Sequence, residues 1–335
     1  MVRAIDLFCG AGGSSFGAQA AGATMIGAVD AWDIATATYA ENFPSAKRNV
    51  ITRRLTDRSG ADLFDRVGRV DLLLASPECT NHSVAKGAAP RCEESQRSGW
   101  YVRKFLEDLE PRWIVLENVT GMKRWDGFDG LIHMLEKRYG YRLHIQTLDA
   151  ADFGVPQSRR RLFIIGDRKK APRPIQPPVG RQISVRQILD PINRWPANPV
   201  FNGKRAEATL ERVQRGITAL GKGNDFLIVY YGSDAAGGWQ TLDRPLRTLT
   251  TLDRFGLIRW DGRTPTLRML QVPELVRAMG LTEPSTKASS TFLLNHGSRR
   301  DKIRLLGNGV CAPVMTAIVS SLTDCTMRVP LMAVA

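Results

Sequence analysis

Short apolar runs alternate with helical patterns along the first half of the chain. The apolar runs have the length of strands and occur at residues 3–8, 24–29, 70–75, 113–116 and 161–165. Between them the pattern predicts helices at 33–42, 100–109 and 131–138, and Ser14 is placed to cap a helix that ends at Ala21. This alternation predicts βαβ units, and therefore an α/β fold with a doubly wound, mostly parallel sheet.

The composition changes after Asp167. Residues 168–199 are rich in proline and arginine and cannot continue the sheet. Beyond them the pattern predicts an amphipathic helix over 205–220 and a strand over 226–231. We therefore predict a main domain formed by residues 1–167 and 286–335, with a second, smaller domain over 168–285.

Length and cysteine usage narrow the class of protein. The chain has 335 residues, 43% of them hydrophobic, and no apolar run approaches the roughly 18 residues that a membrane span needs. Asp6 and a glycine turn interrupt the first apolar stretch, so we expect no signal peptide. Five scattered cysteines without a CxxC pair, and only four histidines, argue against a metal site and favour a reducing cytoplasm.

The charge of the chain suggests its partner. Lysine and arginine number 47 against 33 acidic residues, which gives a net charge of +14. A charge of this sign and size favours nucleic acid, although some basic enzymes act on small substrates.

A glycine turn follows the first predicted strand. Gly10, Gly12 and Gly13 allow a close approach of the backbone to a ligand and precede a helix whose first N–H groups are free. No Lys-Ser/Thr pair follows, which disfavours a phosphate-binding loop, and Ser15 replaces the third glycine of the dinucleotide fingerprint. Asp30 ends the second strand, where a carboxylate can accept hydrogen bonds from a ribose. Together they favour an adenosine-containing ligand, whereas the glycines alone fit a structural turn equally well.

Cys79 lies where an apolar strand gives way to a polar loop. A thiol in this position is held by a rigid strand and faces a cleft, whereas a structural cysteine would more naturally lie within Leu72–Leu74. The polar segment 76–99 is longer than a routine connection and could close over a substrate. Taken alone, a chance free cysteine and a disordered surface loop explain the segment equally well.

Two further segments supply partners for a reactive thiol. Glu117 and Asn118 end a predicted buried strand, where a partly desolvated carboxylate can accept and donate a proton; a helix-capping Glu-Asn pair is the alternative. In Gln157–Arg161, alternation places Arg159 and Arg161 on one side, where two guanidinium groups could fix a phosphate and a base carbonyl. A solvated basic run is the alternative there.

In this order and at these separations, the four segments resemble motifs of the cytosine-C5 DNA methyltransferase family. Asp6–Gly13 looks like the cofactor motif, Pro77–Ser83 like the nucleophile loop, Glu117–Val119 like the Glu-Asn-Val motif, and Gln157–Arg161 like the Gln-x-Arg-x-Arg motif. Gly307–Val310 is similar to the closing motif. Only about 170–240 is unmatched, where the family places its variable, sequence-reading domain.

The resemblance implies a Rossmann-like methyltransferase sheet with a target-recognition domain, and S-adenosylmethionine as the cofactor. It implies that Phe8 stacks on the adenine, that Asp30 holds the ribose and that Asp57 lies near the adenine amino group. The glycines of the turn would approach this cofactor, and Asn308 would border its methionine end.

The resemblance also implies the reaction. Cys79 would add to C6 of a cytosine flipped out of double-stranded DNA, Glu117 would bind N3, Arg161 would hold O2, and Arg159 would contact the DNA backbone or the loop. The expected substrate contacts are Ser83, Arg97, Asn118 and Gln157. The expected setting is a monomer in the cytoplasm of a bacterium or a phage-infected cell, with a cognate restriction nuclease as a possible partner.

The chain departs from the family at residue 78, where Glu78 precedes the cysteine, and at His82, which stands where phenylalanine is usual. A carboxylate beside the nucleophile raises the pKa of a thiol unless it faces away or pairs with a cation. Glu78 therefore contacts a cation, such as that of the cofactor, or marks an altered donor or substrate.

Three competing interpretations of the protein stay open. It could be an enzyme acting on RNA, a catalytically silent DNA-binding relative or a small-molecule Rossmann enzyme.

Overall fold

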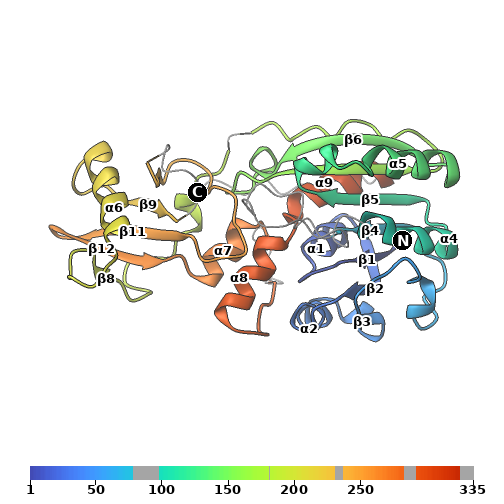
Figure 1. Cartoon of the computed structure of the whole chain (residues 1–335), viewed down its shortest axis with the longest axis horizontal. Coiled ribbons are helices and arrows are strands. Elements are labelled where there is room, and N and C mark those ends of the chain that lie inside the picture. The colour runs from blue at the N-terminus through green and yellow to red at the C-terminus, as the bar shows by residue number, and fades with distance from the viewer. Residues whose placement is uncertain (78–97, 181, 231–236, 283–291, 325–335) are drawn as a thin grey trace.

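The computed structural model describes residues 1–77, 98–180, 182–230, 237–282 and 292–324. Two sheets lie at opposite ends of an elongated molecule, with helices α7 (Val272–Ala278) and α8 (Arg299–Asn308) between them (Figure 1).

The larger sheet has seven strands in the order β3-β2-β1-β4-β5-β7-β6. Strands β1 to β5 pair in parallel, whereas β7 runs antiparallel to both β5 and β6. The prediction of a doubly wound, mostly parallel sheet is therefore confirmed. The strands are β1 Val2–Leu7, β2 Ala23–Asp30, β3 Val50–Thr52, β4 Leu72–Ala75, β5 Trp113–Asn118, β6 Arg142–Asp149 and β7 Arg160–Asp167.

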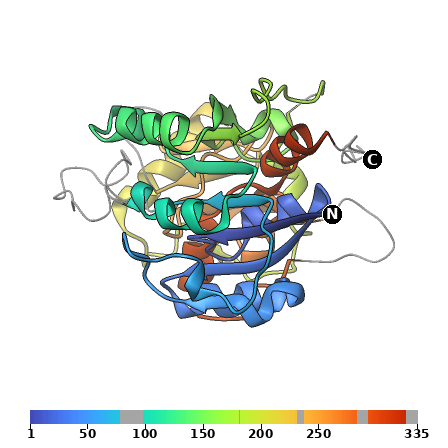
Figure 2. The ribbon, with the colours of Figure 1, turned by 90° about the vertical axis from the view of Figure 1, so that its right-hand side faces the viewer.

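Helices cover both faces of this sheet (Figure 2). On one face, Leu72 and Leu74 share a core with α1 (Gly13–Ala20) and α9 (Ala312–Thr323). On the other, Leu73 packs with α4 (Arg103–Leu109) and α5 (Phe128–His133). Consecutive residues of β4 thus face opposite cores, which explains why this strand is apolar throughout. The remaining helices of this lobe are α2 Asp33–Asn42, the 3-10 turns η1 Pro44–Asn49, η2 Ala61–Leu63, η4 Ser98–Val102, η5 Thr120–Arg124 and η7 Ala150–Phe153, and the π-helical turn η6 Met134–Arg138.

Some of the predicted helix ends and strands differ from the structure. Ser14 lies inside α1 rather than capping it; Gly12, with φ of +98°, is the N-cap residue and makes no side-chain hydrogen bond. The predicted helices at 100–109 and 131–138 each divide into two helical pieces. Strands β3 and β6 were not predicted, because β3 is only three residues long and β6 has no fully apolar run.

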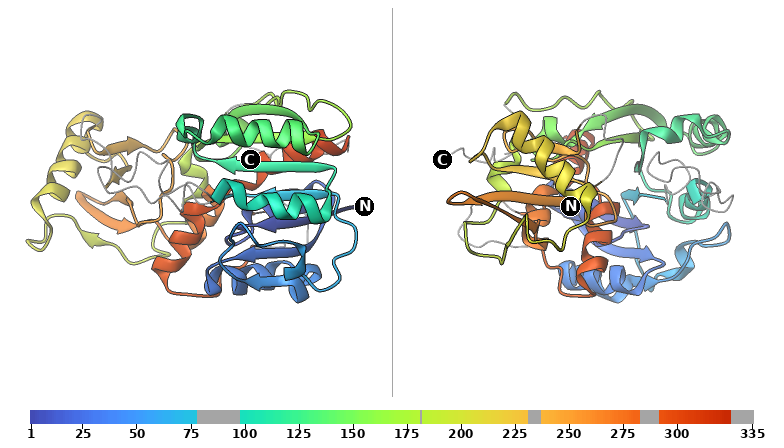
Figure 3. Two further views of the ribbon diagram at one scale, coloured as in Figure 1. Left: turned by 45° about the vertical axis from the view of Figure 1, so that its right-hand side comes forward. Right: turned by 60° about the vertical axis from the view of Figure 1, so that its left-hand side comes forward.

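The smaller sheet has five antiparallel strands in the order β10-β9-β11-β12-β8. Helix α6 (Glu207–Leu220) corresponds to the helix predicted over 205–220. It packs on this sheet through Val213 and Ile217 (Figure 3). The predicted strand at 226–231 corresponds to β9. The boundaries 168–285 stay a prediction. The other strands are β8 Asn198–Pro199, β9 Phe226–Val229, β10 Trp239–Thr241, β11 Phe255–Asp261 and β12 Thr264–Met269, and a 3-10 turn, η8, covers Val185–Ile188.

The stretch Arg299–Thr323, which includes α8 and α9, is long and apolar enough to cross a membrane by length and composition alone. However, 72% of its apolar window is buried inside the protein. This degree of burial is what a core helix shows.

A buried ion pair fastens the smaller sheet to α7. Arg268 of β12 donates to Glu274 at 2.6 Å, and their side chains are only 6% and 0% exposed. Glu274 also accepts hydrogen bonds from the backbone N–H groups of Gln271 at 2.7 Å and Asp190 at 2.9 Å. One buried carboxylate thus accepts all of these hydrogen bonds, so its loss would leave several buried donors without an acceptor.

We expect Glu274→Ala to lower the free energy of unfolding by about 3–5 kcal/mol, because it leaves Arg268 charged and uncompensated in the interior. Asp243→Ala is the matched control. It removes the exposed partner of Arg186, whose ion pair has 57% and 75% exposed side chains, and should cost less than about 1 kcal/mol. Equal losses for the two variants in denaturant unfolding would contradict this assignment.

Candidate functional site

The carboxyl ends of the central parallel strands open onto one cavity of about 360 Å³. Phe8 follows β1, Asp30 ends β2, Ser76 and Pro77 follow β4, and Glu117 lies near the end of β5. The wall is completed by Arg159 and Arg161 at the start of β7, and by Asn308 at the end of α8. This edge is where open α/β sheets bind their ligands.

The glycine turn shapes one end of the cavity. Gly10 has φ of +53°, and its N–H group donates to Asp30 Oδ2 at 2.9 Å, while Trp32 N–H donates to Asp30 Oδ1 at 2.9 Å. A side chain at Gly13 would lie 2.4 Å from the carbonyl oxygen of Val310, so only glycine allows the start of α1 to approach the closing motif. Burial raises the pKa of Asp30, and the hydrogen bonds from backbone N–H groups oppose this.

Glu117 and Arg161 form an ion pair inside the cavity, with 3.1 Å between Arg161 Nε and Glu117 Oε1. Burial raises the pKa of Glu117 above its usual value, while Arg161 and Arg159 act in the opposite direction. Burial thus favours the protonated form of Glu117, and the two arginines favour its charged form. The structure brings Glu117 and Arg161 together in the cavity, and their roles stay predictions.

Gln157 and Arg159 hold other parts of the chain. Gln157 is fully buried, and its side chain donates to the carbonyl oxygen of Ala278 at 2.9 Å and accepts from Leu249 N–H at 2.8 Å. It does not line the cavity, so the structure does not support a substrate contact. Arg159 is 2% exposed and reaches the cavity wall, but its terminal nitrogens donate to the carbonyl oxygens of Leu249 and Gly307.

Three more residues that were predicted to contact substrate or cofactor do not line the cavity. Asn118 is 4% exposed and donates to the carbonyl oxygen of Pro77 at 3.2 Å, so it holds the start of the nucleophile loop. Gly12 is absent from the cavity wall because it faces Phe43 and Tyr39. Asp57 is exposed and also lies outside the cavity, since the chain after β3 reaches the wall at 53–55 and turns to solvent beyond it.

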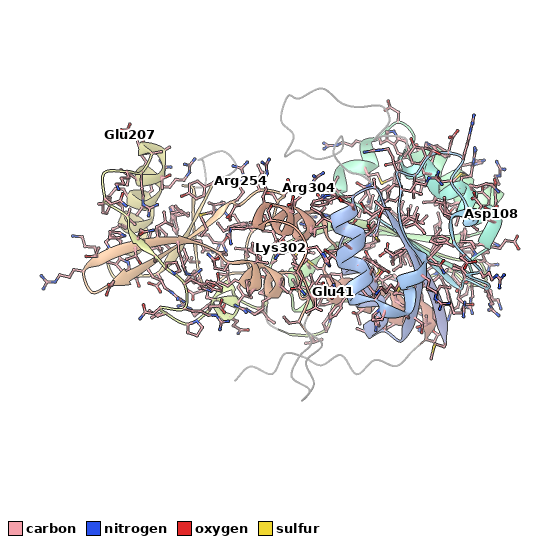
Figure 4. The ribbon with its side chains drawn as sticks, turned by 90° about the horizontal axis from the view of Figure 1, so that it is seen from below. Glu41, Asp108, Glu207, Arg254, Lys302 and Arg304 are labelled. Atoms are coloured by element: carbon pink, nitrogen blue, oxygen red, sulfur yellow. The ribbon has the colours of Figure 1, made fainter. Side chains whose placement is uncertain are left out.

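Sequence reasoning missed several residues of the wall. Leu55, Arg53 and Arg54 line the cavity, a few residues before Asp57, which does not. Trp32 and Arg304 were also missed; the Arg304 guanidinium lies 4.5 Å from the centre of the Trp32 ring. Figure 4 shows Arg304 on the same side of the molecule as Arg254, which precedes β11. An aromatic residue two positions after the strand-end Asp30 was the available signal for Trp32.

The proposed nucleophile Cys79 lies outside the described residues, as do Ser83, Arg97 and Glu78. The described residues on either side of that segment, Pro77 and Ser98, both line the cavity. Cys9 is the one thiol among the described wall residues. Burial raises its pKa well above the usual value, which keeps it protonated and unreactive.

Within the described ranges, no group of three or more His, Cys, Asp or Glu side chains could hold a metal ion.

This fold and this cavity define an α/β protein of the Rossmann-like methyltransferase class. Two solved structures share the fold. The *Entamoeba histolytica* methyltransferase EhMeth has a TM-score of 0.66 and 20% identity, covering 97% of this chain and 98% of its own. The *S. pombe* Dnmt2 methyltransferase has a TM-score of 0.65 and 18% identity, covering 98% and 100%.

The sequence comparison is more specific. The model of the C-5 cytosine-specific DNA methylase family matches residues 2–324, and the chain belongs to this family. Type II methyltransferase M.AgeI from *Thalassovita gelatinovora* is 36% identical over 171 residues, which are 49% of this chain and 39% of that protein. M.HaeII from Haemophilus aegyptius is 24% identical over 331 residues, which are 96% of this chain and 93% of that protein. The chain matches less than half the length of the first curated relatives.

Asp6 is a buried acid behind the glycine turn. It is 0% exposed, and Ser15 Oγ donates to its Oδ2 at 2.7 Å, while no hydrogen-bond partner for its Oδ1 occurs among the described residues. Burial, together with the charges of Asp30 and Glu117, raises the pKa of Asp6 from 3.8 to about 7, although Ser15 opposes this.

We expect Asp6→Asn to remove part of the pH dependence of stability. In the unfolded chain Asp6 ionises near pH 4, but in the folded protein it keeps its proton to about pH 7, so the wild type loses up to about 4 kcal/mol as the pH rises between these values. Asparagine does not titrate, so the variant should gain stability relative to the wild type from pH 4 to 8. Urea unfolding at several pH values measures this, with the exposed Asp261→Asn as control; a constant difference between wild type and Asp6→Asn would refute it.

Proposed function

We propose that this protein is a DNA cytosine-C5 methyltransferase that uses S-adenosylmethionine. Membership of the family supports the reaction class. The observation that carries the proposal is the Glu117–Arg161 ion pair, which shares one cavity with Asp30 and with Pro77, two residues before Cys79.

The described residues fit an adenosyl cofactor. Phe8 offers an aromatic ring, and Asp30 is a carboxylate held in place by backbone N–H groups at the end of β2, as a ribose diol requires. Asn308 offers an exposed amide in the same cavity wall, one turn of α8 from Arg304. When bound, S-adenosylmethionine would supply an electrophilic methyl group.

The protein's own groups would activate the base. The Cys79 thiolate would form a bond to C6 and move the C5=C6 electron pair onto C5, which then takes the methyl group. Glu117, with its raised pKa, would protonate N3 and balance the charge that develops in the ring, while Arg161 would hold O2. Solvent would then take the C5 proton, and the electrons of that C–H bond would re-form the C5=C6 bond and expel the thiolate from C6. The N3 proton would return to Glu117.

The substrate we propose is double-stranded DNA. C6 is inaccessible in a stacked duplex, so the cytosine must leave the helix, at a cost of a few kcal/mol. The net charge of +14 supplies salt-sensitive attraction to phosphates. The smaller sheet would read the target sequence, and Arg205, Arg212, Arg215 and Lys222 are candidate contacts. Arg212 already lies 5.8 Å from the Tyr230 ring and Arg215 donates to the carbonyl oxygen of Gly237, which would hold both side chains in place.

The curated relatives are type II methyltransferases. On this basis we propose a role in DNA methylation within a restriction-modification pair, with a cognate nuclease as partner. A monomer acting in the cytoplasm fits this role, because the described residues of the cavity wall all come from the larger lobe of a single chain.

We expect Cys79→Ser and Cys79→Ala to reduce methyl transfer to DNA to less than about a thousandth of the wild-type rate, because neither side chain can add efficiently to C6. DNA containing 5-fluorocytosine should trap the wild type as a covalent adduct and leave both variants free. Cys92→Ser, in the same segment of the chain, is the control and should still be trapped. Near-native transfer by both Cys79 variants would remove this thiol from the mechanism.

A second test concerns Glu78. If this carboxylate only contacts a cation near the thiol, Glu78→Pro should leave the added group unchanged. It should also lower the pH at which adduct formation is half-maximal, because the cation that Glu78 neutralised is then left uncompensated beside Cys79. Mass spectrometry of nucleosides from treated DNA identifies the added group. A group other than methyl on the wild-type product would show that Glu78 marks an altered donor.

A further inference from the structure

A short segment of the chain, residues 246–250, fastens the smaller sheet to the larger lobe. We call it the junction segment. Leu246 exchanges backbone hydrogen bonds with the segment before β7: its N–H donates to the carbonyl oxygen of Pro156 at 2.9 Å, and its carbonyl accepts from Ser158 N–H at 2.8 Å. Thr248 Oγ1 donates to the carbonyl oxygen of Ser158 at 2.9 Å. Because β10 ends at Thr241 and β11 begins at Phe255, the junction segment connects two strands of the smaller sheet and ties that sheet to the larger lobe.

Arg159 joins this segment to the cofactor side of the cavity. One terminal nitrogen donates to the carbonyl oxygen of Leu249 at 2.9 Å, and the other donates to the carbonyl oxygen of Gly307 at 2.8 Å. With 2% of the residue exposed, these are charge-assisted hydrogen bonds inside the protein. The planar fork of arginine gives each carbonyl group its own nitrogen, whereas lysine would have to serve both from one nitrogen on a shorter side chain.

The junction segment and the closing motif also touch directly. A Cβ atom at Gly307 would lie 2.3 Å from the carbonyl oxygen of Thr250, so the two backbones are as close as glycine allows. The next residue, Asn308, lines the cavity. A shift of residues 249–250 must therefore move the end of α8, and with it the cavity wall.

We propose that Arg159 is a positioning residue that couples the smaller sheet to the cofactor cavity, so that binding of DNA and binding of cofactor strengthen each other. This inference rests on the proposed function. Arg159 would act through Leu249 and Gly307 rather than by contacting DNA, since both terminal nitrogens already have protein acceptors. The thermodynamic consequence is a coupling free energy between the two ligands, which must be the same in both directions.

The test measures the dissociation constant of S-adenosylmethionine without DNA, and again with saturating duplex DNA, for the wild type, Arg159→Met and Arg159→Lys. Without DNA, we expect Arg159→Met to bind the cofactor about tenfold more weakly, because the carbonyl groups of Leu249 and Gly307 lose their charged donor. The factor by which DNA improves cofactor binding in the wild type should fall towards one. Arg159→Lys should lie between the two, because lysine keeps the charge but replaces two separately placed nitrogens with one.

Arg160→Met is the matched control. Arg160 is the adjacent residue, its side chain is exposed, and it carries the same charge, so loss of general attraction to DNA would affect both variants equally. We expect Arg160→Met to keep the wild-type cofactor affinity and the wild-type coupling factor.

Two results would overturn the proposal. The first is that Arg159→Met binds DNA more weakly but keeps the wild-type cofactor affinity, which would make Arg159 a DNA contact. The second is that Arg159→Met keeps the wild-type coupling factor. If Arg159→Met does not fold, the decision rests on Arg159→Lys, for which the same two results count against the proposal. A wild type that binds no S-adenosylmethionine would instead refute the proposed function, so the two failures are distinguishable.

Discussion

The parallel pairing of β1, β2, β4 and β5 is the constraint on which the rest of the structure depends. Parallel strands bring their carboxyl ends to one edge, so residues separated by more than a hundred positions meet there. Phe8, Asp30, Pro77 and Glu117 all reach the cavity for this reason. Because both faces of the sheet are buried, a slip of one residue would move each side chain from one core to the other and disrupt the packing of both.

Charge is arranged in two ways around this edge. Inside the cavity, burial raises the pKa of Glu117, and its ion pair with Arg161 acts in the opposite direction. At the mouth, Arg53, Arg54 and Arg304 add positive charge, and Arg304 is held by the Trp32 ring. The cavity therefore combines a buried carboxyl group with a cationic entrance. The entrance suits the proposed nucleic-acid substrate, and the carboxyl group suits the proposed proton transfer.

The two lobes are connected through buried polar groups rather than through an open hinge. Arg268 and Glu274 fasten the smaller sheet to α7, and Gln157 and Arg159 fasten the junction segment to the larger lobe. Groups of this kind are costly to leave unpaired, so they favour one relative position of the lobes. A base extruded from DNA held by one lobe would then meet a cavity at a fixed place in the other.

The sequence by itself determined the alternation of strands and helices, the family motifs, and the positions of Asp30 and Glu117 at strand ends, because these follow from local periodicity and spacing. It could not decide which polar side chains face the cavity. From the sequence, Gln157 and Arg159 were predicted to contact substrate, but in the structure Gln157 bonds to Leu249 and Arg159 to Gly307. Asp57 was predicted to contact the cofactor, but Leu55 lines the cavity and Asp57 does not. The physical reason is that the hydrogen-bond partners of a buried polar group come from distant parts of the chain, and only the folded arrangement shows whether they are protein or ligand.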